Sequence, residues 1–347
     1  MSASPIRWRR ASTATGLAAI VAVGALGAGS AQAVSGFAFD ERLAGPTRLE
    51  TAVAASKALV PEGSTSQDVV IVSQFAPIDG LTASYLAGLK NAPILFTETN
   101  SMSPVTVAEL ERLKPENIWI VGGFNVISAD LEASWKPKYK VTRYGGTDRY
   151  ETAAKVAQAD FAVTGFEPER VFIANGIREA DALAVGPIAY AKNYPILLTE
   201  PGNVPQATKD ALATLQTPAR TVVGGTAVVS DSTYTALGAN ARLAGADRQA
   251  TAVAVAEYAV ASENFTFKNA ALAGGNNQNA VDALVAAPLT GSTGTPLLFV
   301  QGNASVSEPT RAYLDKHSAN LDDRGFVFGG TNAVSEKAVL EANAAAQ

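Results

Sequence analysis

A pattern of two arginines around a glycine occurs three times in this chain and constrains the fold more than any other sequence feature. The pattern reads Arg-x-x-Gly-x-x-Arg, and a Thr-Ala pair follows it each time. It spans residues 42–48, 143–149 and 242–248, so successive copies begin about 100 residues apart. Self-similarity at a fixed period is the signature of a chain built from repeated structural units.

Further landmarks follow this pattern in the same order in each copy. An aspartate stands two positions before a leucine, at Asp79, Asp181 and Asp282. A proline then opens an apolar run, at Pro93, Pro195 and Pro296. A Gly-Gly pair closes another apolar run, and a serine follows it, at Ser128, Ser230 and Ser335. Because such different residue types agree in order and spacing, composition bias cannot explain the agreement, and the chain is a triplication.

Each copy alternates predicted helices and strands. In the second copy an alanine-rich helical run, 152–161, precedes Arg170–Asn175, a strand rich in β-branched and aromatic residues. Helical spacing over 181–190 precedes the strand that Pro195 opens, and Ser230 is placed to cap a later helix. Strands separated by helices indicate a mainly parallel sheet that is covered on both faces.

The sequence therefore predicts an α/β fold of three repeated, doubly wound domains with mainly parallel sheets. Their limits fall at 34–139, 140–238 and 239–347. No Pro/Ser-rich linker lies at either join, so we expect the domains to pack tightly against each other.

The segment 1–33 has the features of a secretory signal peptide. Arg7, Arg9 and Arg10 give it a basic start, small apolar residues follow, and an Ala-x-Ala sequence ends at Ala33. No later apolar run is long enough to span a membrane, so we expect a secreted protein with no membrane span after cleavage. The chain has no cysteine, which excludes disulfides.

The charge of the mature chain bears on its partners. Removal of 1–33 takes away three arginines and no acidic residue, which shifts the formal net charge from −5 to about −8. Non-specific nucleic-acid binding depends on basic residues that neutralise phosphates. We therefore expect no nucleic-acid partner.

Motifs for catalysis are scarce. The single histidine, His317, has no counterpart in the other copies and is expected at the surface of a polar helix. One histidine without cysteines excludes zinc sites of the usual kind. The chain has no Gly-x-Ser-x-Gly motif, and its Gly-Gly pairs lack the spacing of dinucleotide- or phosphate-binding loops. We therefore expect neither enzymatic activity nor a cofactor.

The repeated aspartates Asp79, Asp181 and Asp282 allow three interpretations. Each precedes a predicted helix and could cap it by accepting hydrogen bonds from free N–H groups. Each could instead form a buried pair with an arginine of the same copy, or contact a ligand directly. The sequence leaves this choice open.

The six arginines of the repeated pattern are stronger candidates for ligand binding, because guanidinium groups hold phosphate and carboxylate groups through forked hydrogen bonds. A structural pairing with an aspartate remains the alternative for one arginine of each couple. The six residues are Arg42, Arg48, Arg143, Arg149, Arg242 and Arg248.

Taken in order, these motifs resemble the cell-wall-binding repeat family type 2, which occurs as three tandem copies in surface proteins of Gram-positive bacteria. The resemblance covers nearly everything from Arg42 to the C-terminal region. It implies three domains packed with pseudo-threefold symmetry, as a monomer with an internal pseudo-trimer. It also implies non-covalent binding of an anionic wall polymer, such as a teichoic-acid-like or acidic glycan, near the domain interfaces.

Carried over by position, the resemblance assigns polymer contacts to the second arginine of each couple, to the three aspartates and to the strands that open at Pro93, Pro195 and Pro296. Two departures stand out. The first copy has Asp-Gly-Leu in place of Asp-Ala-Leu, and it has Thr47 where Asp148 and Asp247 stand in the others. These departures lead us to expect unequal sites.

The predicted function is thus non-catalytic binding of an anionic polymer at the cell wall or cell surface. Two alternatives belong to other classes. A carboxylate-based wall glycan hydrolase would need two carboxylates close together in different environments. An extracytoplasmic small-molecule binding protein would hold its ligand at the ends of the strands.

Overall fold

The apolar runs of the sequence form strands that are buried on both faces. In β2 (Asp68–Ser73) the side chains from Val69 to Val72 are completely buried. The equivalent strands β6 (Arg170–Asn175) and β10 (Ala270–Gly274) are buried in the same way. Burial on both faces is the environment that parallel sheets require.

These strands belong to a computed structural model that describes residues 36–159, 167–275, 281–301 and 305–347. The predicted signal peptide, 1–33, lies outside the described residues. Among the described residues, no helix combines the length and the apolar character needed to cross a membrane.

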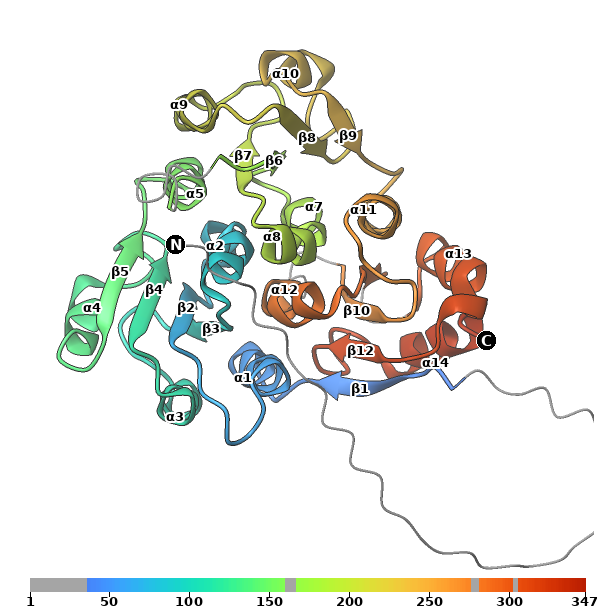
Figure 1. Cartoon of the computed structure of the whole chain (residues 1–347), viewed down its shortest axis with the longest axis horizontal. Coiled ribbons are helices and arrows are strands. Elements are labelled where there is room, and N and C mark those ends of the chain that lie inside the picture. Colours follow the sequence, from blue (N-terminus) through green and yellow to red (C-terminus); the bar gives the residue numbers. More distant parts are fainter. Residues whose placement is uncertain (1–35, 160–166, 276–280, 302–304) are drawn as a thin grey trace, which may run out of the picture. The chain divides into compact units, whose positions relative to one another are not determined.

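In the described part of the chain the strands form three four-stranded sheets, and every pairing within them is parallel (Figure 1). The first sheet has the order β3 (Ile94–Thr97), β2, β4 (Asn117–Val121), β5 (Lys140–Tyr144). The second has the order β7 (Ile196–Thr199), β6, β8 (Ala219–Val223), β9 (Ala241–Leu243). The third has the order β11 (Leu297–Val300), β10, β12 (Gly325–Phe328), β1 (Phe39–Leu43). The predicted α/β class and its three repeated units are confirmed.

The fourth strand of each sheet comes from the next copy in the sequence. β5 and β9, which carry Arg143 and Arg242, extend the sheets of the first and second copies. β1, which carries Arg42, closes the third sheet by pairing in parallel with β12. The sequence copies and the sheets are therefore offset by one strand.

A helix begins at the second arginine of each pattern. These helices are α1 (Arg48–Leu59), α5 (Arg149–Ala157) and α11 (Arg248–Ser262). The residue before each arginine is the N-cap, and its side chain accepts a hydrogen bond from a backbone N–H of the first turn: Thr47, Asp148 and Asp247. Threonine and aspartate both suit this position, so the departure at Thr47 preserves the cap.

Three buried helices lie between the sheets and pack against one another in all three pairings (Figure 1). They are α2 (Ala83–Lys90), α8 (Gly186–Lys192) and α12 (Asp282–Thr293). The equivalent residues Ser84, Gly186 and Ala287 meet there. A β-carbon on Gly186 would lie 3.0 Å from Cβ of Ala287 and 3.1 Å from Oγ of Ser84. Gly186 thus packs against the equivalent position of each of the other two copies, as packing around a pseudo-threefold axis requires.

The short elements before these helices carry the repeated aspartates. In the first copy this element is η1 (Pro77–Gly80), and in the second it is α7 (Glu179–Ala184). The helix predicted over 181–190 is therefore divided, with Val185 between α7 and α8. Pro187, which has no N–H to donate, lies in the first turn of α8.

The remaining helices follow the edge strands β3, β7 and β11 and the inner strands β4, β8 and β12. α3 (Pro104–Leu113), α9 (Gln206–Leu215) and α13 (Glu308–His317) contact β3, β7 and β11, and the short η2 (Ser318–Asn320) follows α13. α4 (Ala129–Trp135), α10 (Asp231–Ala236) and α14 (Glu336–Ala345) begin directly after Ser128, Ser230 and Ser335. Each serine side chain accepts a hydrogen bond from the first turn, which confirms the predicted cap at Ser230.

The expectation that His317 lies at the surface is wrong. Only 6% of the residue is exposed, its ring stacks on Phe267 at 3.9 Å, and Nε2 lies 2.8 Å from Oε1 of Glu257. His317 stands one turn after the buried Tyr313, so it faces the inner side of α13, whose exposed side is mainly polar. It is a packed ring with an acidic partner and lies on an element that carries no candidate site residue.

Candidate functional site

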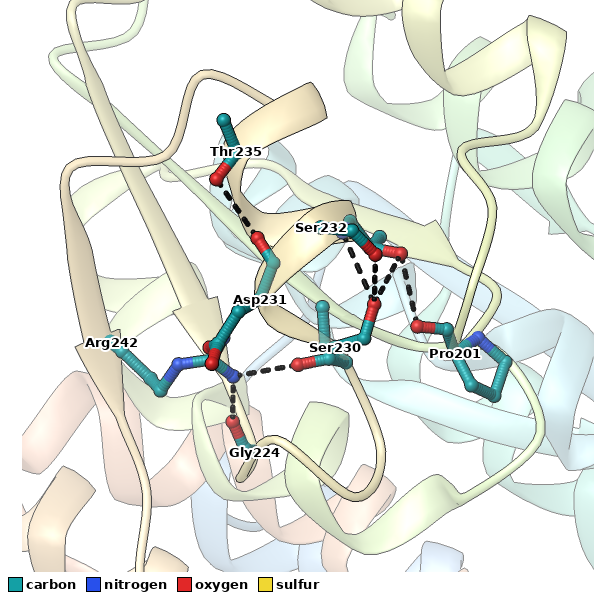
Figure 2. A network of polar contacts seen from close by, with 9 residues as sticks. Pro201, Gly224, Ser230, Asp231, Ser232, Thr235 and Arg242 are labelled. Carbon is teal, nitrogen blue, oxygen red and sulfur yellow. Dashed lines mark hydrogen bonds and ion pairs between the residues drawn. The ribbon is translucent and has the colours of Figure 1, made fainter.

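The first arginine of each couple ties its own strand to the Gly-Gly turn of the adjacent strand. Nη1 of Arg242 donates to the carbonyl oxygens of Gly224, at 2.8 Å, and Val229, at 3.0 Å (Figure 2). Arg42 and Arg143 make the equivalent contacts, to Gly329 at 2.9 Å and to Gly122 at 2.7 Å. These arginines stabilise the turns that follow β8, β12 and β4.

Each first arginine also forms an ion pair with an acidic residue in the helix that follows the Gly-Gly turn. Arg143 bonds to Glu132 at 2.7 Å, Arg42 to Glu336 at 3.0 Å and Arg242 to Asp231 at 3.4 Å. Burial raises the pKa of Glu132, but hydrogen bonds from Lys136 and Arg143 outweigh it and hold that pKa below its ordinary value. The first arginines are therefore engaged within the fold, but only Arg242 pairs with an aspartate, the partner that the structural alternative named.

The second arginines share a different geometry. Nη1 of Arg48, Arg149 and Arg248 donates to the carbonyl oxygen of a residue at the carboxyl end of a central strand. The acceptors are Gln74 at 2.7 Å, Gly176 at 2.8 Å and Gly275 at 2.8 Å. All three arginines are partly exposed, so the fold fixes one edge of the guanidinium group and leaves part of the side chain in contact with solvent.

The repeated aspartates lie at the same ends of the strands and are strongly desolvated. Asp181 and Asp282 are each 7% exposed. Burial raises the pKa of Asp181 to about 6, against the attraction of Arg248 and Arg178. Burial likewise raises the pKa of Asp282 to about 6, against the attraction of Arg48. Each carboxyl group therefore titrates close to neutral pH.

The first aspartate, Asp79, is less buried than the other two, but its pKa shifts in the same direction. Burial raises its pKa, the attraction of Arg149 opposes the shift, and the charge of Asp148 adds to it. In all three cases the arginine that opposes the shift most strongly belongs to the next copy along the chain, with Arg48 serving the third copy. The strongest opposing charge on each aspartate therefore comes from another copy, and an arginine of the same copy contributes only at Asp181, through Arg178.

The interpretation of the aspartates as helix caps is also wrong. The N-caps of η1, α7 and α12 are Ala76, Arg178 and Val281, and none of the three helices has a side-chain cap. Asp181 and Asp282 lie inside the first turn, where a side chain cannot take the N-cap position. The carboxylates of Asp181 and Asp282 are therefore not used in helix capping.

Glycine is required beside two of these carboxylates. Gly224 has a φ of +108° and Gly329 a φ of +103°, a region that other residues rarely adopt. A β-carbon at these positions would also lie 2.6 Å from Oδ2 of Asp181 and 2.4 Å from Oδ2 of Asp282. In the second and third copies the first glycine of the Gly-Gly pair thus makes room for the aspartate, whereas a β-carbon on Gly122 would meet Cγ2 of Val126 at 2.7 Å.

Two of the aspartate–arginine pairs line cavities between copies. One, of about 320 Å³, contains Asp181 and Arg248 together with Thr226 and Asp247. The other, also of about 320 Å³, contains Asp282 and Arg48 together with Thr331 and Thr47. Each cavity therefore combines a buried carboxyl group, a guanidinium group, a hydroxyl group and the exposed backbone of two turns.

The prolines of the apolar strands do not join these sites. Their carbonyl oxygens accept hydrogen bonds at the amino ends of the central strands, from Val70, Phe172 and Ala271. The aspartates and second arginines lie at the opposite, carboxyl ends, where ligands bind in parallel α/β sheets. The prolines therefore position the strands.

One carboxylate near the sites carries no signal in the sequence pattern. Glu179 stands two residues before Asp181, where the first copy has Pro77. Burial raises its pKa, and the attractions of Arg149, Arg48 and Arg248 oppose the shift. Its Oε2 is buried and has no hydrogen-bond partner among the described residues. The positive charges of all three second arginines therefore favour the ionised form of Glu179.

The side chains at these sites suit the recognition of charged and hydroxyl groups. Among the described residues, no three His, Cys, Asp or Glu side chains gather as metal ligands. Asp247 accepts the cap hydrogen bond of α11 from Ala250 at 2.8 Å, and Thr47 takes the same position in the third pair. A second carboxylate is therefore not common to the three sites.

Comparison with known proteins agrees with this architecture. Residues 42–132, 143–234 and 242–339 match the family described as cell wall binding domain 2. The N-acetylmuramoyl-L-alanine amidase LytC of Bacillus subtilis strain 168 is 30% identical over 298 residues, which are 86% of this chain and 56% of the relative. The amidase enhancer of the same bacterium is 28% identical over 303 residues, 86% of this chain and 39% of the relative.

Two solved structures share the fold. Cwp8 from Clostridium difficile superposes with a TM-score of 0.76 and 27% identity, covering 88% of this chain and 51% of its own. Cwp6 from the same organism has a TM-score of 0.74 and 28% identity, covering 87% and 47%. The chain spans about half the length of these proteins, and the similarity lies in the repeats.

Proposed function

We propose that this chain, which belongs to the cell wall binding domain 2 family, binds an anionic wall polymer without catalysis through three sites between its copies. The chain binds the cell wall and is located at the wall or cell surface, as its family requires. The anionic character of the polymer and the residues that hold it form the proposal. The observation that carries it is the cyclic placement of Asp79 with Arg149, Asp181 with Arg248, and Asp282 with Arg48.

Within the proposal, the second arginines are the polymer contacts. Each is fixed along one edge by a backbone carbonyl, so it loses little side-chain entropy when it binds an anion. Arg42, Arg143 and Arg242 instead hold the Gly-Gly turns, and we assign them to support of the sites.

Three sites on one rigid framework suit a repeating ligand. A hydrogen bond to a charged group contributes about 1.5–3 kcal/mol, so one site alone binds weakly. Linked sites raise the overall avidity by about 10²–10⁴ where the spacing of the ligand permits simultaneous contact. A polymer with regularly spaced phosphate or carboxylate groups meets this condition, whereas a small molecule occupies one site at a time.

Binding rather than hydrolysis is supported by the carboxylates themselves. A glycan hydrolase needs a paired acid and base, or acid and nucleophile. Asp148 and Asp247, the acidic neighbours of the second arginines, each accept a hydrogen bond that caps a helix, at 2.8 Å. Thr47 in the third pair has no carboxylate at all. The similarity to an amidase covers 56% of that relative, so it leaves room there for a separate catalytic part.

Sedimentation with purified Gram-positive wall sacculi tests the proposal. The mature chain is expected to pellet with sacculi that retain their anionic polymers and to stay soluble with sacculi stripped of them. Replacing Arg48, Arg149 and Arg248 together by glutamate is expected to abolish pelleting.

The matched control reverses three exposed lysines away from the sites: Lys57, Lys268 and Lys337. It changes the net charge equally and breaks only surface ion pairs, which contribute little to stability. Circular dichroism checks that both triple variants are folded. Equal pelleting of wild type with both kinds of sacculi, or of both triple variants, would refute the proposal.

A further inference from the structure

The three candidate sites are not equivalent, and exposed apolar side chains mark the difference. Among the described residues, the exposed large apolar side chains are Phe75, Val107, Phe124, Ile177 and Leu340. Phe75, Phe124 and Ile177 lie directly after the carboxyl ends of β2, β4 and β6, on the edge that holds the aspartate–arginine pairs. Exposed apolar groups gathered at one edge indicate an interaction site.

Phe124 occupies a position that is polar in the other two sites. It follows Gly123, as Thr226 follows Gly225 and Thr331 follows Gly330. Those threonines line the cavities with Asp181 and Asp282. The turn before Phe124 packs in the same way, because a β-carbon on Gly123 would lie 2.8 Å from the carbonyl oxygen of Gly146. Phe124 therefore stands at the site of Asp79 and Arg149, with 59% of the residue exposed.

The ring of Phe124 is held in place although it is exposed. The guanidinium carbon of Arg143 lies 4.4 Å from the ring centroid, and Arg143 is itself fixed by Glu132 and by backbone carbonyls. An exposed ring that rests on an immobilised cation loses little freedom when a ligand covers it.

The other two apolar residues lie on the loops that form the same site. Ile177 directly follows Gly176, whose carbonyl oxygen accepts the hydrogen bond of Arg149. Phe75 begins the loop that leads to Asp79 and is 69% exposed. At the equivalent position the third copy has a polar residue, Asn276, which lies outside the described residues.

We propose that the Asp79–Arg149 site binds a sugar ring of the polymer, while the other two sites bind its charged groups. A pyranose ring presents C–H groups on its faces and hydroxyl groups at its rim. Phe124, Phe75 and Ile177 offer apolar contacts for the faces, and Asp79 with Arg149 offers hydrogen-bond partners for the rim. This inference rests on the proposed function and deepens it by naming a sugar-containing polymer as the ligand.

The test replaces each apolar residue by the one that another copy carries at the same position. The variant is Phe75→Asn, Phe124→Thr and Ile177→Asn, and the control is Leu340→Asn, which removes an equally exposed apolar side chain from α14. Binding is measured to two probes: sacculi that bear sugar-containing anionic polymer, and immobilised poly(glycerol phosphate) without sugars.

The expected result is an affinity for sacculi about 10-fold lower in the triple variant, because the apolar contacts with the faces of the sugar ring are lost. Its affinity for the sugar-free polymer and both affinities of the control should match wild type. Unchanged affinity for sacculi would overturn the inference while the proposed function stands. A wild type that forms dimers in light scattering through these residues would overturn it as well. Failure of wild type to bind either probe would instead refute the proposed function.

Discussion

Arg48 and Asp282 line one cavity, although they lie near opposite ends of the described chain. Burial raises the pKa of Asp282, and the attraction of Arg48 opposes that rise. The first copy therefore completes the site of the third, and the three candidate sites form a closed cycle.

The two arginines of a couple should separate stability from binding. Arg143→Met removes the partner of Glu132 and three backbone contacts, so the free energy of unfolding should fall by about 3 kcal/mol or more. Arg149→Met removes the hydrogen bond to Gly176 and should cost about 1 kcal/mol while wall binding falls sharply. Urea denaturation and sacculus pelleting measure the two effects. If one of the two variants had the larger effect in both assays, the assignment of Arg143 to stability and Arg149 to binding would be contradicted.

Gly224→Ala should destabilise the fold by about 2 kcal/mol or more. Alanine is strained at a φ of +108°, and its β-carbon would meet Oδ2 of Asp181 and Cγ2 of Val228 at 2.6 Å. Gly202→Ala is the matched control, because nothing lies within 4 Å of a β-carbon there. Thermal denaturation compares the two variants, and equal melting temperatures would show that Asp181 does not need this space.

The aspartates should make stability depend on pH in a defined direction. Asp181 and Asp282 have a pKa of about 6 in the folded chain, against an ordinary value of 3.8. Because these pKa values are raised, the two groups stabilise the fold fully below pH 3.8, and this contribution is lost as the pH rises through 6.

The double variant Asp181→Asn, Asp282→Asn isolates this effect, because carboxylates held by ion pairs, such as Glu132, act in the opposite direction. At pH 7.5 the variant should exceed wild type by on the order of 2–3 kcal/mol per group, and the difference should vanish near pH 4. Urea denaturation across this range measures it. A difference that is constant with pH would contradict the burial of these groups.

Glu179→Gln should strengthen binding of a polyanion. The negative charge of Glu179 opposes the three second arginines, so its removal should raise affinity about 3- to 10-fold at low salt and less at high salt. Glu111→Gln, on the exposed face of α3, is the control. Titration with poly(glycerol phosphate) measures the change, and weaker binding would show that Glu179 itself contacts the ligand.

Much of the fold could be predicted because it depends on local signals. Apolar runs, helical spacing and the serine before α10 predicted the alternating elements and the cap at Ser230. The partners of Asp79, Asp181 and Asp282 could not be predicted, because spacing within one copy carries no information about contacts between copies. The same limit applies to the offset of the fourth strands, since a strand pairs equally well on either side of a sequence boundary.

Single positions were harder still. His317 looks exposed because its neighbours in the sequence are polar, yet the helix turns its ring inward onto Phe267. Glu179 breaks the repetition and so escapes any search for repeated residues. The aspartates looked like helix caps because they precede helices, but their positions inside the first turn depend on a boundary of one or two residues.

The pairing of β1 with β12 also closes the three copies into a ring. In an open solenoid each unit rests on its neighbours, and units can be gained or lost at the ends. Here every sheet takes its last strand from another copy, and β1, the first strand of the described residues, completes the third sheet. A copy added or removed at either end would change which strand completes the third sheet. The three copies therefore form a closed set, unlike the units of a solenoid.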